Sequence, residues 1–171
     1  GRLVILDSAH ASLLRDSGLP EWLSSDRAAS IIAVRHLFSG KSCTIIDFGT
    51  TLTVDFIDGE GRYEGGNISL GCRTRFKAIN RYSRSLPLID TPADSPALGN
   101  SLDTSISSGI ISGIMFEISG YVCKKEDNIV VLTGGDAIYF AKRIKNSIFV
   151  ICNLVLIGLA LIADGYVNEK N

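Results

Sequence analysis

The sequence lacks an excess of either charge, and it lacks the cysteine pairs of a metal site. Its 171 residues carry a formal net charge of −1, which gives no general attraction to nucleic acid or to an anionic membrane. The four cysteines stand far apart, at positions 43, 72, 123 and 152, and form no Cys-x-x-Cys pair. This spacing does not suit zinc and predicts free thiols in a reducing cytosol. We therefore expect a cytoplasmic protein with no nucleic-acid or membrane partner.

A leader segment and an initiator methionine are also missing. The chain begins GRLVILDSAH, which has no basic-then-apolar leader and predicts a strand from Arg2 to Asp7. We expect that the natural protein begins earlier and that this chain is a fragment of it. The longest apolar run, Ile148 to Ala163, has 16 residues, about 24 Å as a helix. A bilayer core is about 30 Å thick, so the run predicts a buried strand and a core helix instead of a membrane span.

The elements that are present indicate a single class of fold. Hydrophobic residues make up 46% of the chain, enough for a sizeable core. Three β-prone segments follow one another closely, which predicts antiparallel pairing. The expected elements are a helix at 24–40, strands at 43–48, 52–57 and 62–70, helices at 72–84 and 101–124, a strand at 129–133, a helix at 137–144, a strand at 147–151 and a helix at 153–163. Their order predicts an α/β domain with a mixed sheet and flanking helices.

The helix expected at 101–124 carries an apolar residue at every fourth position. This stripe predicts a buried face formed by Ile106, Ile110, Ile114, Ile118 and Val122. Gly109 and Gly113 lie on the same helix and permit close approach of another helix or of a sheet.

The segment CTIIDFGTTLTVDFIDGEGRYEGG, residues 43–66, places an aspartate and a glycine at the end of an apolar strand. A glycine there lets the backbone turn sharply and approach a ligand, and the hydroxyl and N–H groups of two threonines suit phosphate oxygens. Asp47 can hold a cation that neutralises those oxygens. The alternative is a tight hairpin whose β-branched threonines simply favour a strand. The motif alone favours the hairpin.

Two further segments bear on this choice. LTGGDA, residues 132–137, leads from a strand into a glycine pair at a helix start, where N–H groups can face an anion; an ordinary strand–helix turn is the alternative. In LSSDRAAS, residues 23–30, Asp26 suits the removal of a proton from a substrate hydroxyl, and Arg27 suits a substrate carboxylate. Capping by Ser24 or Ser25, with Asp26 favouring the helix dipole, explains the same residues without a function.

Together these blocks resemble type III pantothenate kinases, most closely those of Bacteroidetes-like bacteria. The resemblance runs from about Pro20 to Ala160, and its blocks are DR at 26–27, DFGTTLTVDFID at 47–58, GRYEGGNISLG at 61–71, TRFKAINRYSRSLP at 74–87, SISSGIISG at 105–113, LTGGDA at 132–137 and NLVLIGLA at 153–160. It implies membership of the actin, hexokinase and Hsp70-like kinases, with ribonuclease-H-like domains and a homodimer. The helix at 101–124 can supply the dimer surface, although an internal core explains its stripe equally well.

The resemblance also implies an activity and the residues that carry it. The activity is transfer of the γ-phosphoryl group of ATP to pantothenate, the first step of coenzyme A biosynthesis, with Mg²⁺ and a monovalent cation, K⁺ or NH₄⁺. The general base falls on Asp26 and the monovalent-cation ligand on Asp47. The other implied contacts are Ser24, Ser25, Arg27 and Thr104 for pantothenate and Gly49 and Thr50 for ATP.

The chain departs from the family pattern at several positions. At four positions the family's tyrosine, glycine, proline and threonine are replaced, in that order, by Ser17, Ser24, Leu70 and Leu102. Thr104, two residues after Leu102, can take the place of the missing threonine. The family's N-terminal Asp-x-Gly-Asn-Thr turn, which contacts Mg²⁺ and phosphate, is not in this chain. We therefore expect residues 1–41 to be a remnant of a first ribonuclease-H-like domain, residues 42–171 to be the second, and the chain alone to have little activity. Two alternatives stay open: a catalytically impaired regulatory or interaction homologue, and a kinase for another hydroxylated small molecule.

Overall fold

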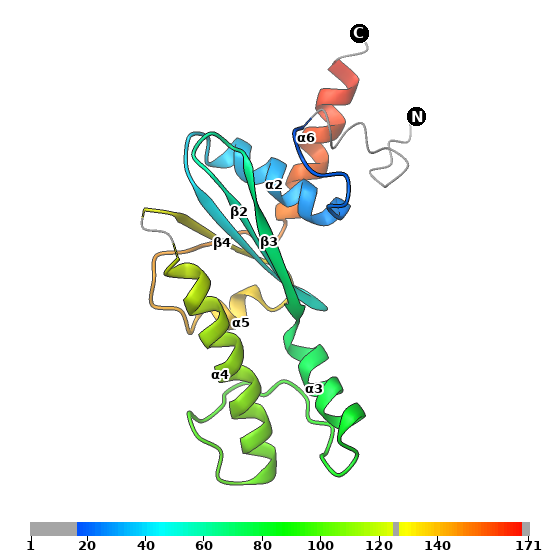
Figure 1. The fold of residues 1–171 in the computed structure, drawn as a ribbon, viewed down its shortest axis with the longest axis vertical. Coiled ribbons are helices and arrows are strands. Elements are labelled where there is room, and N and C mark those ends of the chain that lie inside the picture. The colour runs from blue at the N-terminus through cyan, green and yellow to red at the C-terminus, as the bar shows by residue number, and fades with distance from the viewer. Residues whose placement is uncertain (1–16, 125–126, 169–171) are drawn as a thin grey trace.

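A mixed sheet forms the centre of the computed structural model, which describes residues 17–124 and 127–168 (Figure 1). The strand order is β3-β2-β1-β4-β5. The strands are β1 (Cys43–Phe48), β2 (Thr51–Ile57), β3 (Tyr63–Leu70), β4 (Ile129–Thr133) and β5 (Phe149–Val150). The strand expected at 2–7 lies outside the described residues.

Strand pairing confirms the predicted antiparallel neighbours. It also brings together the ends of two strands that are far apart in the sequence. β1 pairs with β2, and β2 with β3, in antiparallel fashion, whereas β1 pairs with β4 in parallel. Parallel neighbours end at the same edge of a sheet. Asp47 at the end of β1 therefore lies beside Thr133 at the end of β4.

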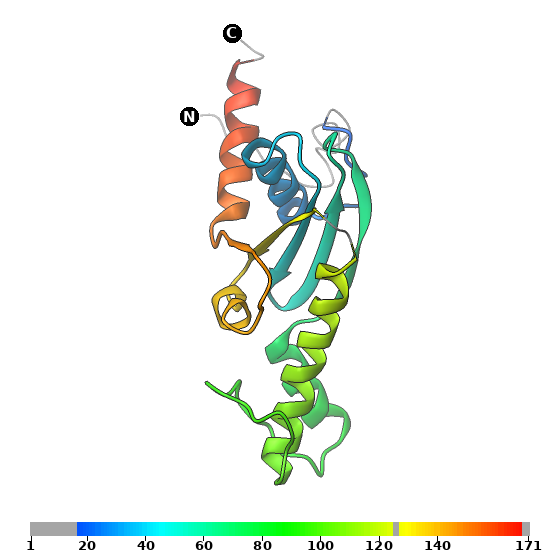
Figure 2. The same cartoon turned by 90° about the vertical axis from the view of Figure 1, so that its left-hand side faces the viewer.

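Helices cover both faces of the sheet (Figures 1 and 2). The helices are α2 (Ser25–Leu37), α3 (Cys72–Tyr82), α4 (Leu102–Val122), α5 (Ala137–Ala141) and α6 (Leu154–Asn168). Side chains alternate along β1, so Ile45 packs with residues of α2 and α6 while Ile46 packs with residues of α3, α4 and α5. This two-sided packing confirms the predicted α/β class. The described part of residues 1–41 joins the packing through α2, and its assignment to a first domain stays a prediction.

The long helix α4 has the buried face that its periodicity predicts. Each residue of the stripe is at most 8% exposed: Ile106, Ile110, Ile114, Ile118 and Val122. The helix begins with a capping box in which Ser101 and Thr104 exchange side-chain to backbone hydrogen bonds. A Cβ at Gly109 would meet no atom within 4 Å, and one at Gly113 would only reach Arg75 Nη1 at 4.0 Å. These glycines therefore make no close approach to another element among the described residues.

The C-terminal elements differ from the prediction. α5 ends at Ala141, three residues earlier than expected, and α6 continues to Asn168. β5 is not a buried strand, since Phe149 is 51% and Val150 39% exposed. The reason is that β5 pairs only with β4, at the edge of the sheet. No helix within the described ranges is long and apolar enough to cross a membrane.

Close packing of α6 on α2 depends on Gly158. A Cβ added there would overlap Ala29 O and lie 2.8 Å from Ala29 Cα. We expect Gly158→Ala to lower the free energy of unfolding by about 2 kcal/mol, because a backbone overlap forces the two helices apart. Denaturant unfolding monitored by circular dichroism measures the change.

A matched control lies in the same helix. Gly165 faces open space, so Gly165→Ala is expected to raise the free energy of unfolding by about 0.5–1 kcal/mol through helix propensity alone. Equal effects of the two substitutions would contradict the packing argument.

Candidate active site

Asp47 occupies the centre of a polar row at the end of the sheet. It pairs across the sheet with Thr53 of β2 and with Thr133 of β4. By strand alternation its side chain points to the face covered by α2, the same face as Ile45. The carboxylate is therefore directed toward the helix that carries Asp26.

Two glycines allow the chain to close tightly around this strand end. Gly134 has φ +91°, and a Cβ there would overlap Asp47 Oδ1 and lie 2.6 Å from Phe48 O. At Gly71 a Cβ would overlap Gly49 O and lie 2.8 Å from Thr50 O. Gly49 itself has ordinary space, since a Cβ added there would lie 3.5 Å from Thr51 O. Tight packing against neighbouring backbone is thus a feature of Gly134 and Gly71, and the expected approach of Gly49 to a ligand stays a prediction.

The turn between β1 and β2 is exposed but anchored. Gly49 and Thr50 are both exposed to solvent. Thr50 O accepts hydrogen bonds from Gly71 N at 3.0 Å and from Thr74 Oγ1 at 2.7 Å. These bonds fix the turn to the start of α3 and leave an exposed Gly-Thr segment beside Asp47.

The segment LTGGDA leads into α5, which is shorter than the expected helix. This helix has five residues, too few for a strong helix dipole. Its first amide groups are also engaged, since Asp136 N donates to Phe48 O at 3.3 Å and Ala137 N to Gly134 O at 3.2 Å. The segment places Gly134 close to Asp47, and an anion contact by the amides of the glycine pair stays a prediction.

Asp26 lies in the first turn of α2 and is exposed to solvent. Its Oδ1 accepts a hydrogen bond from Arg27 N at 2.9 Å. Ser24 is the N-cap residue but its side chain makes no capping hydrogen bond, and Ser25 is the first helical residue. Capping therefore does not account for the serine at position 24.

Asp26 lies close enough to Asp47 for its negative charge to act on the Asp47 carboxyl. The pKa of the Asp47 carboxyl is raised, chiefly by burial and further by the negative charges of Asp26 and Asp55. A bound cation would offset both effects. The described residues contain no group of three or more His, Cys, Asp or Glu side chains that could hold a metal ion. A cation held at Asp47 would therefore draw its other ligands from outside such a cluster, for example from phosphate oxygens of a bound substrate.

The raised pKa predicts that Asp47 destabilises the fold at neutral pH. In the folded state the carboxyl binds its proton more tightly than in the unfolded chain, so its penalty is absent at low pH and grows as the pH rises through the folded pKa. We expect Asp47→Asn to raise the free energy of unfolding at pH 7 in buffer without K⁺, with the gain vanishing below about pH 4. Urea unfolding across this pH range measures it.

Asp58→Asn is the matched control with the opposite sign. Hydrogen bonds from Arg62 lower the pKa of Asp58, so its carboxylate stabilises the fold at neutral pH. Asp58→Asn is expected to lower stability at pH 7. A loss of stability on Asp47→Asn at pH 7 would show that its carboxylate is not penalised by burial.

Arg27 is held by residues that the sequence interpretation did not single out. It is 6% exposed, and its guanidinium forms a two-point ion pair with Asp55 of β2, Nε to Oδ2 at 2.9 Å and Nη2 to Oδ1 at 2.5 Å. Tyr63 also bonds to both partners. The available signal was a charged residue inside the apolar strand TLTVDFI, because buried aspartates are rare unless paired.

Thr104 lies apart from these residues. It belongs to the first turn of α4, where its Oγ1 accepts hydrogen bonds from Asn100 N at 3.0 Å and Ser101 N at 2.9 Å. Figures 1 and 2 show that this end of α4 and the helix α2 are at opposite ends of the molecule. Within one chain, Thr104 is not brought together with Asp26.

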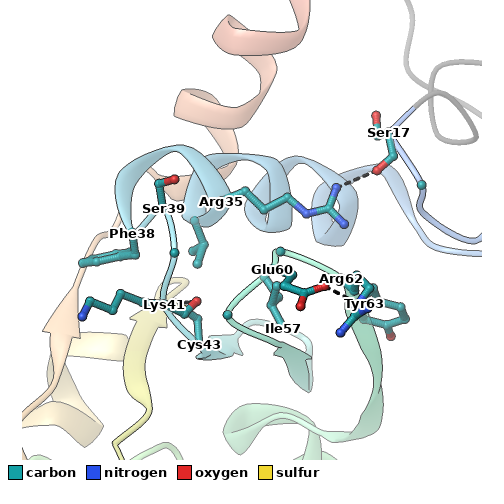
Figure 3. A pocket seen from close by; sticks show the side chains of 15 residues that line it. Ser17, Arg35, Phe38, Ser39, Lys41, Cys43, Ile57, Glu60, Arg62 and Tyr63 are labelled. Carbon is teal, nitrogen blue, oxygen red and sulfur yellow. Dashed lines mark hydrogen bonds and ion pairs between the residues drawn. The ribbon is translucent and has the colours of Figure 1, made fainter.

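A cavity of about 780 Å³ lies beside α2 (Figure 3), and neither Asp26 nor Asp47 lines it. It lies between α2, the loop after α2 and the turn between β2 and β3, and Cys43 and Ile57 are among its lining residues. Cys43 begins β1 and Ile57 ends β2, so the cavity is at the opposite end of these strands from Asp47. Of the positions at which the chain departs from the family pattern, it contains Ser17.

The comparisons with known proteins agree on one family. The family model "Type III pantothenate kinase" matches residues 9–124. Type III pantothenate kinases of Phocaeicola vulgatus and Bacteroides fragilis are 43% and 40% identical over 82% of this chain. The chain spans about 60% of the length of these curated relatives.

Solved structures agree on the fold. A Baf family protein from Campylobacter jejuni is similar at a TM-score of 0.66 and 22% identity, over 86% of this chain and 66% of that chain. MreB 5 of Spiroplasma citri, solved with AMPPNP, is similar at a TM-score of 0.55 and 12% identity, over 83% of this chain and 60% of that chain. The expected actin-like α/β fold is thereby confirmed.

Proposed function

Since the chain belongs to the type III pantothenate kinase family, we propose that the protein carrying it phosphorylates pantothenate with ATP, the first step of coenzyme A biosynthesis. The observation that carries the proposal is the pair of Asp26 and Asp47. One carboxylate is exposed at the start of a helix, and the other is partly buried at a strand end beside an exposed Gly-Thr turn. Phosphoryl transfer needs such a base close to a site for phosphate and a cation.

In the proposed reaction, Asp26 accepts the proton of the primary hydroxyl of pantothenate. The hydroxyl oxygen forms a bond to the γ-phosphorus of ATP as the bond from that phosphorus to the β–γ bridging oxygen breaks. ADP leaves with the bridging oxygen, and the product is 4′-phosphopantothenate. Exposure of Asp26 supports this role, because a substrate hydroxyl can reach the carboxylate from solvent.

The turn at Gly49 and Thr50 is the proposed contact for the ATP phosphates, and Asp47 the proposed ligand of a monovalent cation, K⁺ or NH₄⁺. When bound, this cation and Mg²⁺ neutralise charge on the phosphates. Support comes from the exposure of the turn and from its anchoring to α3, which holds the donors in place before substrate binds.

Pantothenate is proposed to bind at Ser24, Ser25 and Arg27, which adjoin Asp26 in the chain. The role of Thr104 as a pantothenate contact rests on the resemblance alone.

We also propose a homodimer, for which the exposed face of α4 is the candidate surface: Phe116 is 76% exposed, and Gly109 and Gly120 face open space. Sedimentation equilibrium tests it, and a monomer at micromolar concentration would contradict it. A cytoplasmic location fits an enzyme of coenzyme A biosynthesis.

ATP consumption by the full-length native protein tests the function. We expect turnover with pantothenate, Mg²⁺ and K⁺, and none with sugars or other hydroxylated acids. Turnover with a sugar alone would point to another substrate. Nucleotide binding without turnover on any acceptor would favour a regulatory or interaction protein.

A further inference from the structure

A buried polar cluster connects α2 to the sheet directly after Asp26. It consists of Arg27 from α2, Asp55 from β2 and Tyr63 from β3, and we call it the Arg27 cluster. Arg27 is 6% and Asp55 2% exposed. Charged side chains are seldom buried to this degree unless they are paired, and this pair joins residues 28 positions apart in the sequence.

The bonds of this cluster engage two of the three guanidinium nitrogens. Arg27 Nε donates to Asp55 Oδ2 at 2.9 Å, and Nη2 donates to Asp55 Oδ1 at 2.5 Å and to Tyr63 Oη at 3.1 Å. Tyr63 Oη in turn donates to Asp55 Oδ1 at 3.0 Å. A two-point pairing of this kind fixes the plane of the guanidinium as well as its position. None of these bonds involves Nη1.

Charge and packing keep the cluster in one arrangement. The pKa of Tyr63 is raised to about 12, chiefly by burial and then by Asp55, so its phenol stays protonated and keeps donating at neutral pH. The hydrogen-bonded carboxylate of Asp55 raises the pKa of Arg27. Across the sheet from Asp55 lies Gly66, where a Cβ would overlap Asp55 Oδ1 and lie 2.7 Å from Arg27 Nη2. β3 therefore leaves the space that the ion pair occupies.

We infer that Asp55 and Tyr63 are positioning residues, which hold the Arg27 guanidinium so that its Nη1 edge alone can meet the carboxylate of the substrate. The inference rests on the proposed function, and it concerns how the substrate-binding segment of that site is held in position. Arg27 directly follows Asp26 in the first turn of α2, so the cluster also anchors the segment on which the proposed base stands. Low exposure of Arg27 agrees with access from one edge.

Steady-state kinetics of Tyr63→Phe in the full-length native protein tests the inference. This variant removes one hydroxyl and keeps the ring. We expect the KM for pantothenate to rise about tenfold, because a hydrogen bond to a charged group is lost. The KM for ATP should be unchanged. With the alcohol analogue, in which CH₂OH replaces the substrate carboxylate, the KM should change less than twofold, since Arg27 then has no anion to meet.

Asp55→Asn is the second variant, with larger expected effects on the same parameters. Tyr82→Phe and Asp58→Asn are the matched controls, because the Tyr82 side chain is exposed and Asp58 pairs with the exposed Arg62 at the surface. Both are expected to leave the two KM values within twofold of wild type. Equal rises of KM for pantothenate and for its alcohol analogue, or no rise for either, would overturn the inference.

Hydrogen–deuterium exchange separates this inference from the proposed function. If the wild-type protein shows no turnover with pantothenate, the proposed function fails, and exchange still reports on the cluster. Faster exchange in the first turn of α2 in Tyr63→Phe, but not in Tyr82→Phe, is the expected result. Unchanged exchange in that turn would show that the cluster does not hold the segment.

Discussion

An Asp26→Asn variant of the full-length protein is expected to lose at least a hundredfold in kcat for pantothenate phosphorylation. The amide cannot accept the hydroxyl proton, and general-base catalysis typically contributes about 10²- to 10⁴-fold. Asp26 is exposed and its hydrogen bond to Arg27 N is local, so the fold should persist. Single-turnover kinetics at saturating ATP and pantothenate measures the effect on the chemical step.

Asp103→Asn is the control for loss of a negative charge from the first turn of a helix. Asp103 and Asp26 are each the second residue of a helix, and both are exposed. Each substitution should change stability by at most about 1 kcal/mol through the helix dipole. Only Asp26→Asn should change kcat by orders of magnitude. An Asp26→Asn variant with wild-type kcat would remove Asp26 from the role of general base.

Gly134→Ala is expected to lower the free energy of unfolding by about 3 kcal/mol and to weaken ATP binding at least tenfold. The φ of +91° is unfavourable for alanine, and a Cβ would overlap Asp47 Oδ1 and crowd the backbone of Phe48. Overpacking costs about 1–3 kcal/mol and a left-handed backbone about 1–2 kcal/mol. Displacement of Asp47 and of the adjacent turn is the reason for the loss of ATP binding. Denaturant unfolding and calorimetric titration with a non-hydrolysable ATP analogue measure the two effects.

The neighbouring glycine supplies the control for stability. Gly135 has no positive φ, and a Cβ there would meet nothing within 4 Å. Gly135→Ala should therefore change the free energy of unfolding by less than about 1 kcal/mol. If both substitutions were equally harmless, the tight closure around Asp47 would not be a structural requirement.

Sequence patterns predicted the elements whose burial is periodic. The i, i+4 stripe of α4 and the close succession of β1, β2 and β3 each follow from local spacing, and the structure confirms them. Prediction failed at β5, where the local sequence is apolar but the strand lies at the edge of the sheet, and at the C-terminal end of α5, which stops at Ala141. An apolar run such as Phe149–Val150 does not reveal whether a partner covers it.

The candidate site was predictable in its single residues but not in its contacts. Asp26 and Asp47 each stand at the end of an element, which the sequence shows, whereas their proximity depends on how α2 crosses the sheet. The pairing of Arg27 with Asp55 and the crowding of Gly71 by Gly49 are contacts between segments far apart in the chain. Such contacts arise from tertiary packing, and local periodicity carries no information about them.

The most direct test of the central claim is mass-spectrometric detection of 4′-phosphopantothenate. The full-length native protein is incubated with ATP, Mg²⁺, K⁺ and pantothenate, in parallel with its Asp26→Asn variant. We expect the wild type to form the product in stoichiometric proportion to ADP and the variant to form at least a hundredfold less. Absence of 4′-phosphopantothenate with the wild-type protein at saturating substrates would contradict it.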